Sequence, residues 1–165
     1  MAKTLDEYLT CFVSKNTPQW LLKRKGIPST LELEIEGGEY SSVGNEGLWK
    51  VVLEELQGNA YKAVWGVQFP YDSRYKEQWP KFKEITGEFK FRLYHNGSDE
   101  VLAFSDNGCG IPKENHEHIV RKGFSTFGTT GIGLTTMKED LTELGATLSF
   151  ESEVGKGTTF YIILP

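Results

Sequence analysis

The amino-acid sequence predicts an α+β fold, a two-layer sandwich in which about three helices cover one face of a mostly antiparallel sheet. Strand-like and helix-like segments are mixed along the 165 residues without the regular alternation of a parallel sheet. The last four strand-like segments form two neighbouring pairs, each with glycine in its turn. Hydrophobic residues make up 38% of the chain, which is enough to bury a core in a single domain.

The N-terminal part of the chain is predicted to hold helical turns and then one strand. Loosely periodic apolar positions over residues 4–25, interrupted by a proline, indicate one or two short helices. Apolar residues alternate with glutamate over residues 31–36, which is typical of a half-buried strand that ends at a pair of glycines. We expect residues 1–28 to be a linker-like segment of a single domain spanning residues 1–165.

A long helix is predicted from the N-cap residue Asn45 to about Trp65. Residues 66–87 match no periodic pattern and are predicted to be an insertion. The remaining predicted elements are strand 89–93, strand 101–104, a helix from Pro112 that carries His116, helix 133–144 closed by Gly145, strand 147–152 and strand 158–164.

Polar residues of the long helix lie where an apolar flank is expected. At about 100° per residue, its apolar side holds Leu48, Val52, Leu56, Ala60 and Ala63. The opposite side, which we expect to face solvent, holds Lys50, Glu54, Gln57 and Tyr61. Glu55, Asn59 and Lys62 fall together beside the apolar flank. Polar groups buried there need partners, which a bound ligand with a metal would supply; a solvated charged stripe is the alternative.

Charge and cysteine content argue against several classes of protein. Eighteen Lys+Arg against 23 Asp+Glu give a net charge of −5, which is not the footprint of a nucleic-acid-binding protein. No apolar run approaches the roughly 20 residues of a membrane span, and no signal peptide is evident. Cys11 and Cys109 are too few for a disulfide framework. We therefore expect a cytoplasmic location, with no membrane contact from this chain.

Glycines are concentrated in the C-terminal part, where ten of the 18 lie from Gly97 onward. Residues 106–111 follow a predicted strand, and glycine there lets a backbone approach a ligand closely. The carboxylate of Asp106 is suited to accept a hydrogen bond from an exocyclic amine such as that of adenine. Residues 128–134 precede a predicted helix, whose first N–H groups form a natural phosphate cradle. An ordinary turn before a helix is the alternative for the first of these segments.

Taken together, these segments resemble the motifs of the Bergerat-type ATPases, a superfamily that includes histidine kinases, gyrase, a heat-shock chaperone and MutL. The motifs are, in order, Glu55-x-x-x-Asn59-Ala60-x-Lys62, Asp106-x-Gly108-x-Gly110-Ile111, Gly131-x-Gly133-Leu134 and Gly155-x-Gly157-Thr158-x-Phe160. The last 35 residues are most similar to the ATP-binding domain of bacterial sensor histidine kinases. Two positions depart from that pattern: Ala63 replaces a common aromatic residue, and Phe127 replaces a lysine of the lid.

This resemblance implies a Bergerat fold that binds ATP together with Mg²⁺. Asp106 would bind the adenine amine, and Thr158 would reach the same amine through water. Gly108 and Gly110 would admit the base, against which Ile111 would pack.

The same resemblance implies how the phosphates are bound. Asn59 would coordinate Mg²⁺, and Lys62 would contact a phosphate. Glu55 stands where several relatives hold a carboxylate that acts as a general base or orients the nucleophile. The lid and helix start that would meet the phosphates comprise Gly128, Thr129, Thr130, Gly131, Ile132, Gly133 and Leu134.

The function implied is that of the catalytic domain of a two-component sensor histidine kinase. It would transfer the γ-phosphate of ATP to a histidine on a separate dimerisation domain, which then serves a response regulator. His116-Glu117 imitates the acceptor dipeptide, but its location after the Asp106 motif predicts an exposed helical histidine instead. A stand-alone serine-protein kinase of the anti-sigma-factor type and a non-catalytic nucleotide-binding interaction module remain alternatives. Whether the parent protein is membrane-anchored is left open.

Overall fold

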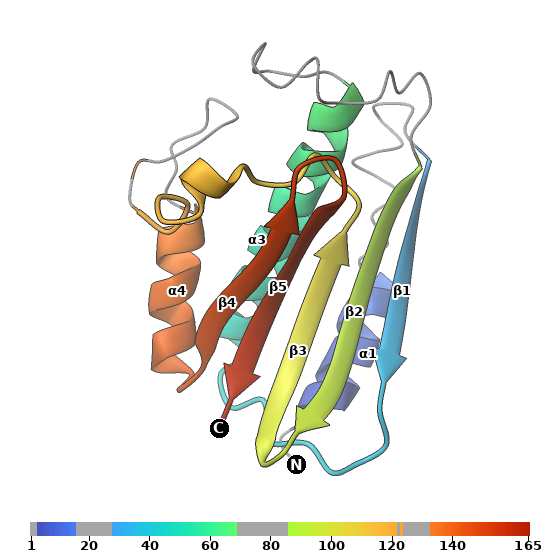
Figure 1. Cartoon of the computed structure of the whole chain (residues 1–165). Coiled ribbons are helices and arrows are strands. Elements are labelled where there is room, and N and C mark those ends of the chain that lie inside the picture. Colours follow the sequence, from blue (N-terminus) through green and yellow to red (C-terminus); the bar gives the residue numbers. More distant parts are fainter. Residues whose placement is uncertain (1–2, 16–27, 69–85, 122, 124–132) are drawn as a thin grey trace.

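Five strands form one mixed sheet with helices on a single face, as Figure 1 shows. The computed structural model describes residues 3–15, 28–68, 86–121, 123 and 133–165. Its helices and strands are α1 (Leu5–Lys15), β1 (Ser29–Ile35), α3 (Glu46–Gln68), β2 (Gly87–Asn96), β3 (Asp99–Asp106), α4 (Gly133–Glu143), β4 (Thr147–Glu153) and β5 (Gly157–Leu164). The strand order is β1-β2-β3-β5-β4, and only β1 and β2 pair in parallel. The predicted α+β two-layer sandwich is therefore confirmed.

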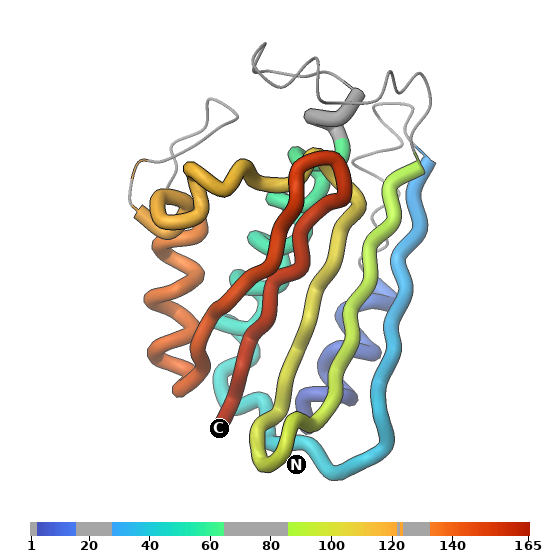
Figure 2. Tube along the Cα trace, viewed as in Figure 1, coloured from blue at the N-terminus to red at the C-terminus, as the bar shows by residue number. Residues whose placement is uncertain are grey.

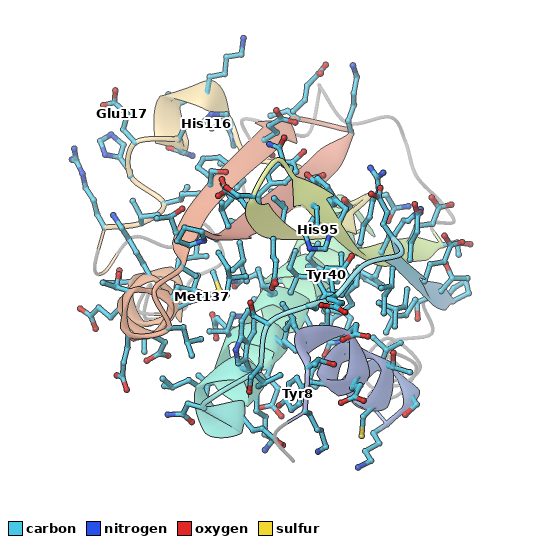
Figure 3. All side chains as sticks on the ribbon, turned by 90° about the horizontal axis from the view of Figure 1, so that it is seen from below. Tyr8, Tyr40, His95, His116, Glu117 and Met137 are labelled. Atoms are coloured by element: carbon cyan, nitrogen blue, oxygen red, sulfur yellow. The ribbon has the colours of Figure 1, made fainter. Side chains whose placement is uncertain are left out.

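The core lies between the sheet and α1, α3 and α4. Every second residue of β2 is buried because side chains alternate between the two faces of a strand. Phe91 of β2 lies 4.3 Å from Phe104 of β3, centroid to centroid, and meets Phe12 of α1 edge to face. Met137 of α4, labelled in Figure 3, is 1% exposed and closes the core on the side of β4. No described element covers the outer face of the sheet.

The long helix begins where the sequence predicts, but its buried side is wider than predicted. Asn45 caps α3, because its Oδ1 accepts the N–H groups of Gly47 and Leu48 at 3.1 and 3.2 Å. The prediction that Gln57 and Tyr61 face solvent is wrong, since they are only 6% and 7% exposed. Sheet residues cover this side of the helix as well, and the Tyr61 ring meets Phe89 of β2 edge to face at 5.1 Å.

Two further elements differ from the prediction. In place of the helix expected from Pro112, the chain forms one 3-10 turn, η2 (Lys113–Asn115), followed by hydrogen-bonded turns as far as Val120. Helix α3 continues to Gln68, so the predicted insertion begins later than residue 66, and its residues 69–85 lie outside the described part of the chain. Within the described residues, no helix is long and apolar enough to cross a membrane.

Candidate functional site

Three segments that are distant in sequence meet at one end of the sheet. Figure 2 shows the turn after β3 running between the β4–β5 hairpin and the C-terminal half of α3. Cys109 in this turn links all three through its backbone: its N–H donates to the carbonyl of Ala63 on α3 at 3.1 Å, and its carbonyl accepts the N–H of Gly155 in the hairpin at 2.9 Å. The turn is therefore fixed to both neighbours by main-chain hydrogen bonds.

Asp106, the last residue of β3, presents a carboxyl group at this end of the sheet. Its Oδ1 accepts the N–H of Gly108 at 2.8 Å. Thr158, its cross-strand neighbour on β5, also donates its backbone N–H to the carboxyl. Burial raises the pKa of this carboxyl to about 7, although the two amide donors lower it. Asp106 can therefore either donate or accept a hydrogen bond near neutral pH.

The glycines of the turn are required by close packing against the chain itself. A Cβ atom on Gly108 would lie 2.5 Å from the Cβ of Ala63 on α3. Gly110 has φ +73°, and a Cβ there would overlap the carbonyl oxygen of Glu153. The small side chain of Ala63 thus fits against the glycine turn.

The three polar residues predicted beside the apolar flank of α3 do lie at its border. Glu55, Asn59 and Lys62 are all half-buried, and Val51, one turn before Glu55, is 47% exposed. The side-chain nitrogen of Asn59 is buried and has no hydrogen-bond partner among the described residues. Unpaired buried amides are costly, so this side chain is suited to bind something further.

Glu55 faces the start of α4 across this border. A Cβ atom on Gly133, the first residue of α4, would overlap the Glu55 carboxylate, so the two are in direct contact. The N-terminal end of a helix carries partial positive charge, which favours a carboxylate there. The hydroxyl of Thr135 donates to the carbonyl of Val120 at 3.2 Å and ties the first turn of α4 to the segment after η2.

Residues 44–165 match the family described as histidine kinase-, DNA gyrase B-, and HSP90-like ATPases. The chain belongs to this ATPase family. The resemblance noted from the four motifs is thereby confirmed.

Curated relatives of this chain are sensor kinases, and the chain matches only a small part of each one's length. The sensor histidine kinase DcuS of Escherichia coli K12 is 34% identical over 83 residues, which cover 50% of this chain and 15% of DcuS. A probable C4-dicarboxylate sensor kinase of Bacillus subtilis is 36% identical over 72 residues, 41% of this chain and 14% of that kinase.

Solved structures of histidine kinases share its fold. The catalytic domain of ThkA matches with a TM-score of 0.71 at 19% identity, covering 100% of this chain and 96% of that domain. Full-length ShkA in complex with AMPPNP matches with a TM-score of 0.71 at 17% identity, covering 100% of this chain and 30% of ShkA.

The predicted site residues of this ATPase fall into two described groups. Asp106, Gly108, Gly110, Ile111 and Thr158 gather at the glycine turn. Glu55, Asn59 and Lys62 lie along α3, with Gly133 and Leu134 at the start of α4. The predicted phosphate-binding residues Gly128, Thr129, Thr130, Gly131 and Ile132 lie outside the described residues. Among the residues that are described, no three His, Cys, Asp or Glu side chains form a metal-binding group. The Mg²⁺ assignment of Asn59 stays a prediction.

Two residues of the site escaped sequence reasoning. Ser152 of β4 accepts the N–H of Ile111 at 2.8 Å, and no pattern in the sequence indicated this contact. His116, predicted to be exposed on a helix, is instead half-buried, with Nε2 2.9 Å from the carbonyl of Ile111 and its ring against Phe150. Only Glu117 of the predicted acceptor-like pair is exposed and points outward (Figure 3).

Neither Cys109 nor His95 is placed to act as a nucleophile. Burial raises the pKa of the Cys109 thiol to about 12, so it stays protonated at neutral pH and packs as a small apolar residue. His95 stacks on Tyr40 at 4.6 Å between ring centroids (Figure 3). It pairs with Glu100 beside the β2–β3 turn, at the opposite end of β3 from Asp106.

Proposed function

We propose that this chain is the ATP-binding catalytic domain of a sensor histidine kinase. It binds Mg-ATP and transfers the γ-phosphoryl group to a histidine on a separate dimerisation domain. The observation that carries the proposal is that Glu55 and Asn59 lie one turn apart on one border of α3, with Glu55 against the first residue of α4, in a member of this ATPase family. The part of DcuS that this chain matches is about 15% of the length of DcuS. The kinase activity of a complete sensor protein is therefore proposed for this chain's parent, not observed.

The base of ATP is proposed to bind at the glycine turn. Asp106 presents a carboxyl that meets the exocyclic amine of adenine, and Ile111 packs against the ring. Gly108 and Gly110 let the turn lie directly against Ala63 of α3 and Glu153 of β4. The half-buried Lys62 lies one turn beyond Asn59 on α3 and is suited to neutralise phosphate charge.

Asn59 is the proposed Mg²⁺ ligand. Its amide oxygen is a suitable ligand for this ion, while the buried side-chain nitrogen, which has no hydrogen-bond partner among the described residues, remains able to donate to a phosphate oxygen. Bound there, Mg²⁺ would neutralise negative charge on the β- and γ-phosphates.

Glu55 is proposed to act on the acceptor imidazole. The imidazole nitrogen forms a bond to the γ-phosphorus while the bond from that phosphorus to the bridging oxygen breaks, and ADP leaves with the electron pair. Glu55 orients the imidazole or accepts the proton that its nitrogen loses. Positioning of this kind is the main contribution a protein makes to phosphoryl transfer.

Transfer of labelled phosphate tests the proposal. The chain is incubated with γ-labelled ATP, Mg²⁺ and the dimerisation domain of its parent protein. Acid-labile, base-stable label on that domain is the expected result, because phosphohistidine has this stability. Acid-stable label would identify a serine kinase of the anti-sigma-factor type instead, and ATP binding without label on any partner would identify a nucleotide-binding interaction module.

Location and partners follow from the same proposal. ATP and free cysteines such as Cys11 and Cys109 are typical of the reducing cytoplasm. The direct partner is the histidine-bearing dimerisation domain, and a response regulator receives the phosphoryl group from it.

A further inference from the structure

His116, of the acceptor-like pair His116-Glu117, is bound to the last residue of the glycine turn. Its Nε2 lies 2.9 Å from the carbonyl oxygen of Ile111, five residues earlier in the chain. A carbonyl oxygen can only accept, so Nε2 carries the proton of this hydrogen bond. A nitrogen that donates in this way has no free lone pair for attack on phosphorus, which leaves His116 with a role other than that of phosphoacceptor.

Aromatic packing holds the His116 ring in this position. The ring meets Phe150 of β4 edge to face, with 5.0 Å between the centroids. Phe150 in turn packs on Phe160 of β5, which is 5% exposed and belongs to the core. Because aromatic pairs favour particular ring orientations as well as distances, His116 reaches Ile111 from a support that is anchored in the core.

Ile111 is fixed by side chains at both of its main-chain groups. While its carbonyl accepts from His116, its N–H donates to Oγ of Ser152 at 2.8 Å. Ser152 itself donates to the carbonyl of Gly157 in β5 at 3.0 Å. Ile111 lies between β3 and η2, outside any helix or strand, so these two side chains set the position of its backbone.

We infer that His116 is a positioning residue for the nucleotide: by holding the carbonyl of Ile111, it keeps the Ile111 side chain where the base packs. This inference rests on the proposed function, because it requires a nucleotide base against Ile111. His116 acts through Ile111 at the base end of the site and not on the phosphates. It therefore contributes to nucleotide binding and not to the rate of transfer from a bound nucleotide.

Three substitutions separate the hydrogen bond from the packing of the ring. His116→Gln places an amide nitrogen where Nε2 lies and keeps a donor. His116→Leu keeps apolar packing on Phe150 without a donor, and the shorter side chain of His116→Asn does not reach Ile111. We expect His116→Leu and His116→Asn to bind ATP about five- to tenfold more weakly, the value of one hydrogen bond, and His116→Gln to keep the wild-type affinity.

Two measurements distinguish positioning from a loss of fold. Dissociation constants of the whole chain for ATP and ADP are measured by calorimetry with Mg²⁺ at pH 8. Both should rise by the same factor in His116→Leu, because the two nucleotides share the base and differ in their phosphates. In the phosphotransfer assay the KM for ATP should rise while kcat stays unchanged. Thermal melting without nucleotide follows the fold of each variant.

His95→Leu serves as the comparison for the loss of a histidine. His95 is also half-buried and also packs on an aromatic ring, that of Tyr40. It lies beside the β2–β3 turn, at the opposite end of β3 from Asp106. The affinity of His95→Leu for both nucleotides should therefore equal that of the wild type.

Wild-type affinity in His116→Leu or His116→Asn would overturn the inference, and so would a His116→Gln variant that binds as weakly as these two. A loss confined to ATP, or a fall in kcat with unchanged KM, would also overturn it, because the effect would then lie at the phosphates. A wild-type chain that binds neither ATP nor ADP would instead overturn the proposed function, and this inference with it.

Discussion

The carboxylate of Glu55 lies against the backbone of Gly133, so the middle of α3 and the first residue of α4 are in contact. Any side chain at position 133 would occupy the volume of this carboxylate. The proposed general base Glu55 and the proposed phosphate-binding start of α4 are therefore in steric contact. A substitution at Gly133 is expected to move the Glu55 carboxylate.

Gly133→Ala is expected to displace Glu55 and to lower phosphotransfer at least tenfold, because small errors in positioning are costly in catalysis. Alanine suits a helix better than glycine, so the melting temperature should not fall by a comparable extent. Gly58→Ala is the matched control, since a Cβ on Gly58 meets nothing within 4 Å. Normal transfer by Gly133→Ala would show that the contact has no role in catalysis.

Glu55→Ala is expected to remove phosphotransfer by about a hundredfold or more, the usual contribution of a general base, with ATP affinity nearly unchanged. Transfer is measured with labelled ATP and affinity by calorimetry. Glu54→Ala, on the exposed neighbouring position, serves as control. Transfer by Glu55→Ala at the wild-type rate would remove Glu55 from the proposed mechanism.

Asn59→Asp is expected to abolish Mg²⁺-dependent ATP binding without unfolding the chain. The substitution keeps the size of the side chain but replaces the amide donor with negative charge near the phosphates. Calorimetric titration with and without Mg²⁺ measures the effect, and thermal melting checks the fold. Unchanged affinity in Mg²⁺ would contradict the assignment of Asn59 as a ligand.

Asp106 is expected to make the chain less stable as the pH rises from about 4 to about 7. The folded carboxyl holds its proton up to pH about 7, whereas the unfolded one releases it near pH 4. The folded chain therefore binds more protons in this window, and its free energy of unfolding decreases through it.

Urea unfolding at pH 5 and pH 8 measures this dependence. Asp106→Asn should lose less stability than the wild type between the two values, and Asp99→Asn, at the other end of β3, should behave as the wild type. Equal losses in Asp106→Asn and the wild type would mean that the carboxyl is not buried in solution.

Local patterns in the sequence predicted the elements well, because alternation and capping depend on neighbouring residues. Asn45 was recognisable as an N-cap because its amide bonds residues two and three positions ahead. Gln57 and Tyr61 were misjudged because the buried width of a helix depends on what packs on it, here Phe89 of a strand beyond residues 69–85.

The motifs of the site were predictable from the sequence, but the hydrogen bonds and packing contacts between them were not. The order of the motifs indicated the nucleotide family, and the family match confirms it. Ser152 gave no signal because its partner Ile111 is 41 residues away in sequence. The glycines gave a partial signal. Gly108 and Gly110 indicated that another group approaches the backbone closely, and in this structure those groups are Ala63 and Glu153 of the chain itself.

The two main-chain hydrogen bonds of Cys109 can form only one after the other while the chain is synthesised on the ribosome. The carbonyl of Ala63 is available to this turn as soon as α3 and β3 have emerged, but the N–H of Gly155 exists only when the final hairpin has been translated. The hydroxyl of Ser152 arrives with the same hairpin. A nascent chain that ends before β4 therefore lacks the bonds from Gly155 to Cys109 and from Ile111 to Ser152, and its glycine turn is held only by α3.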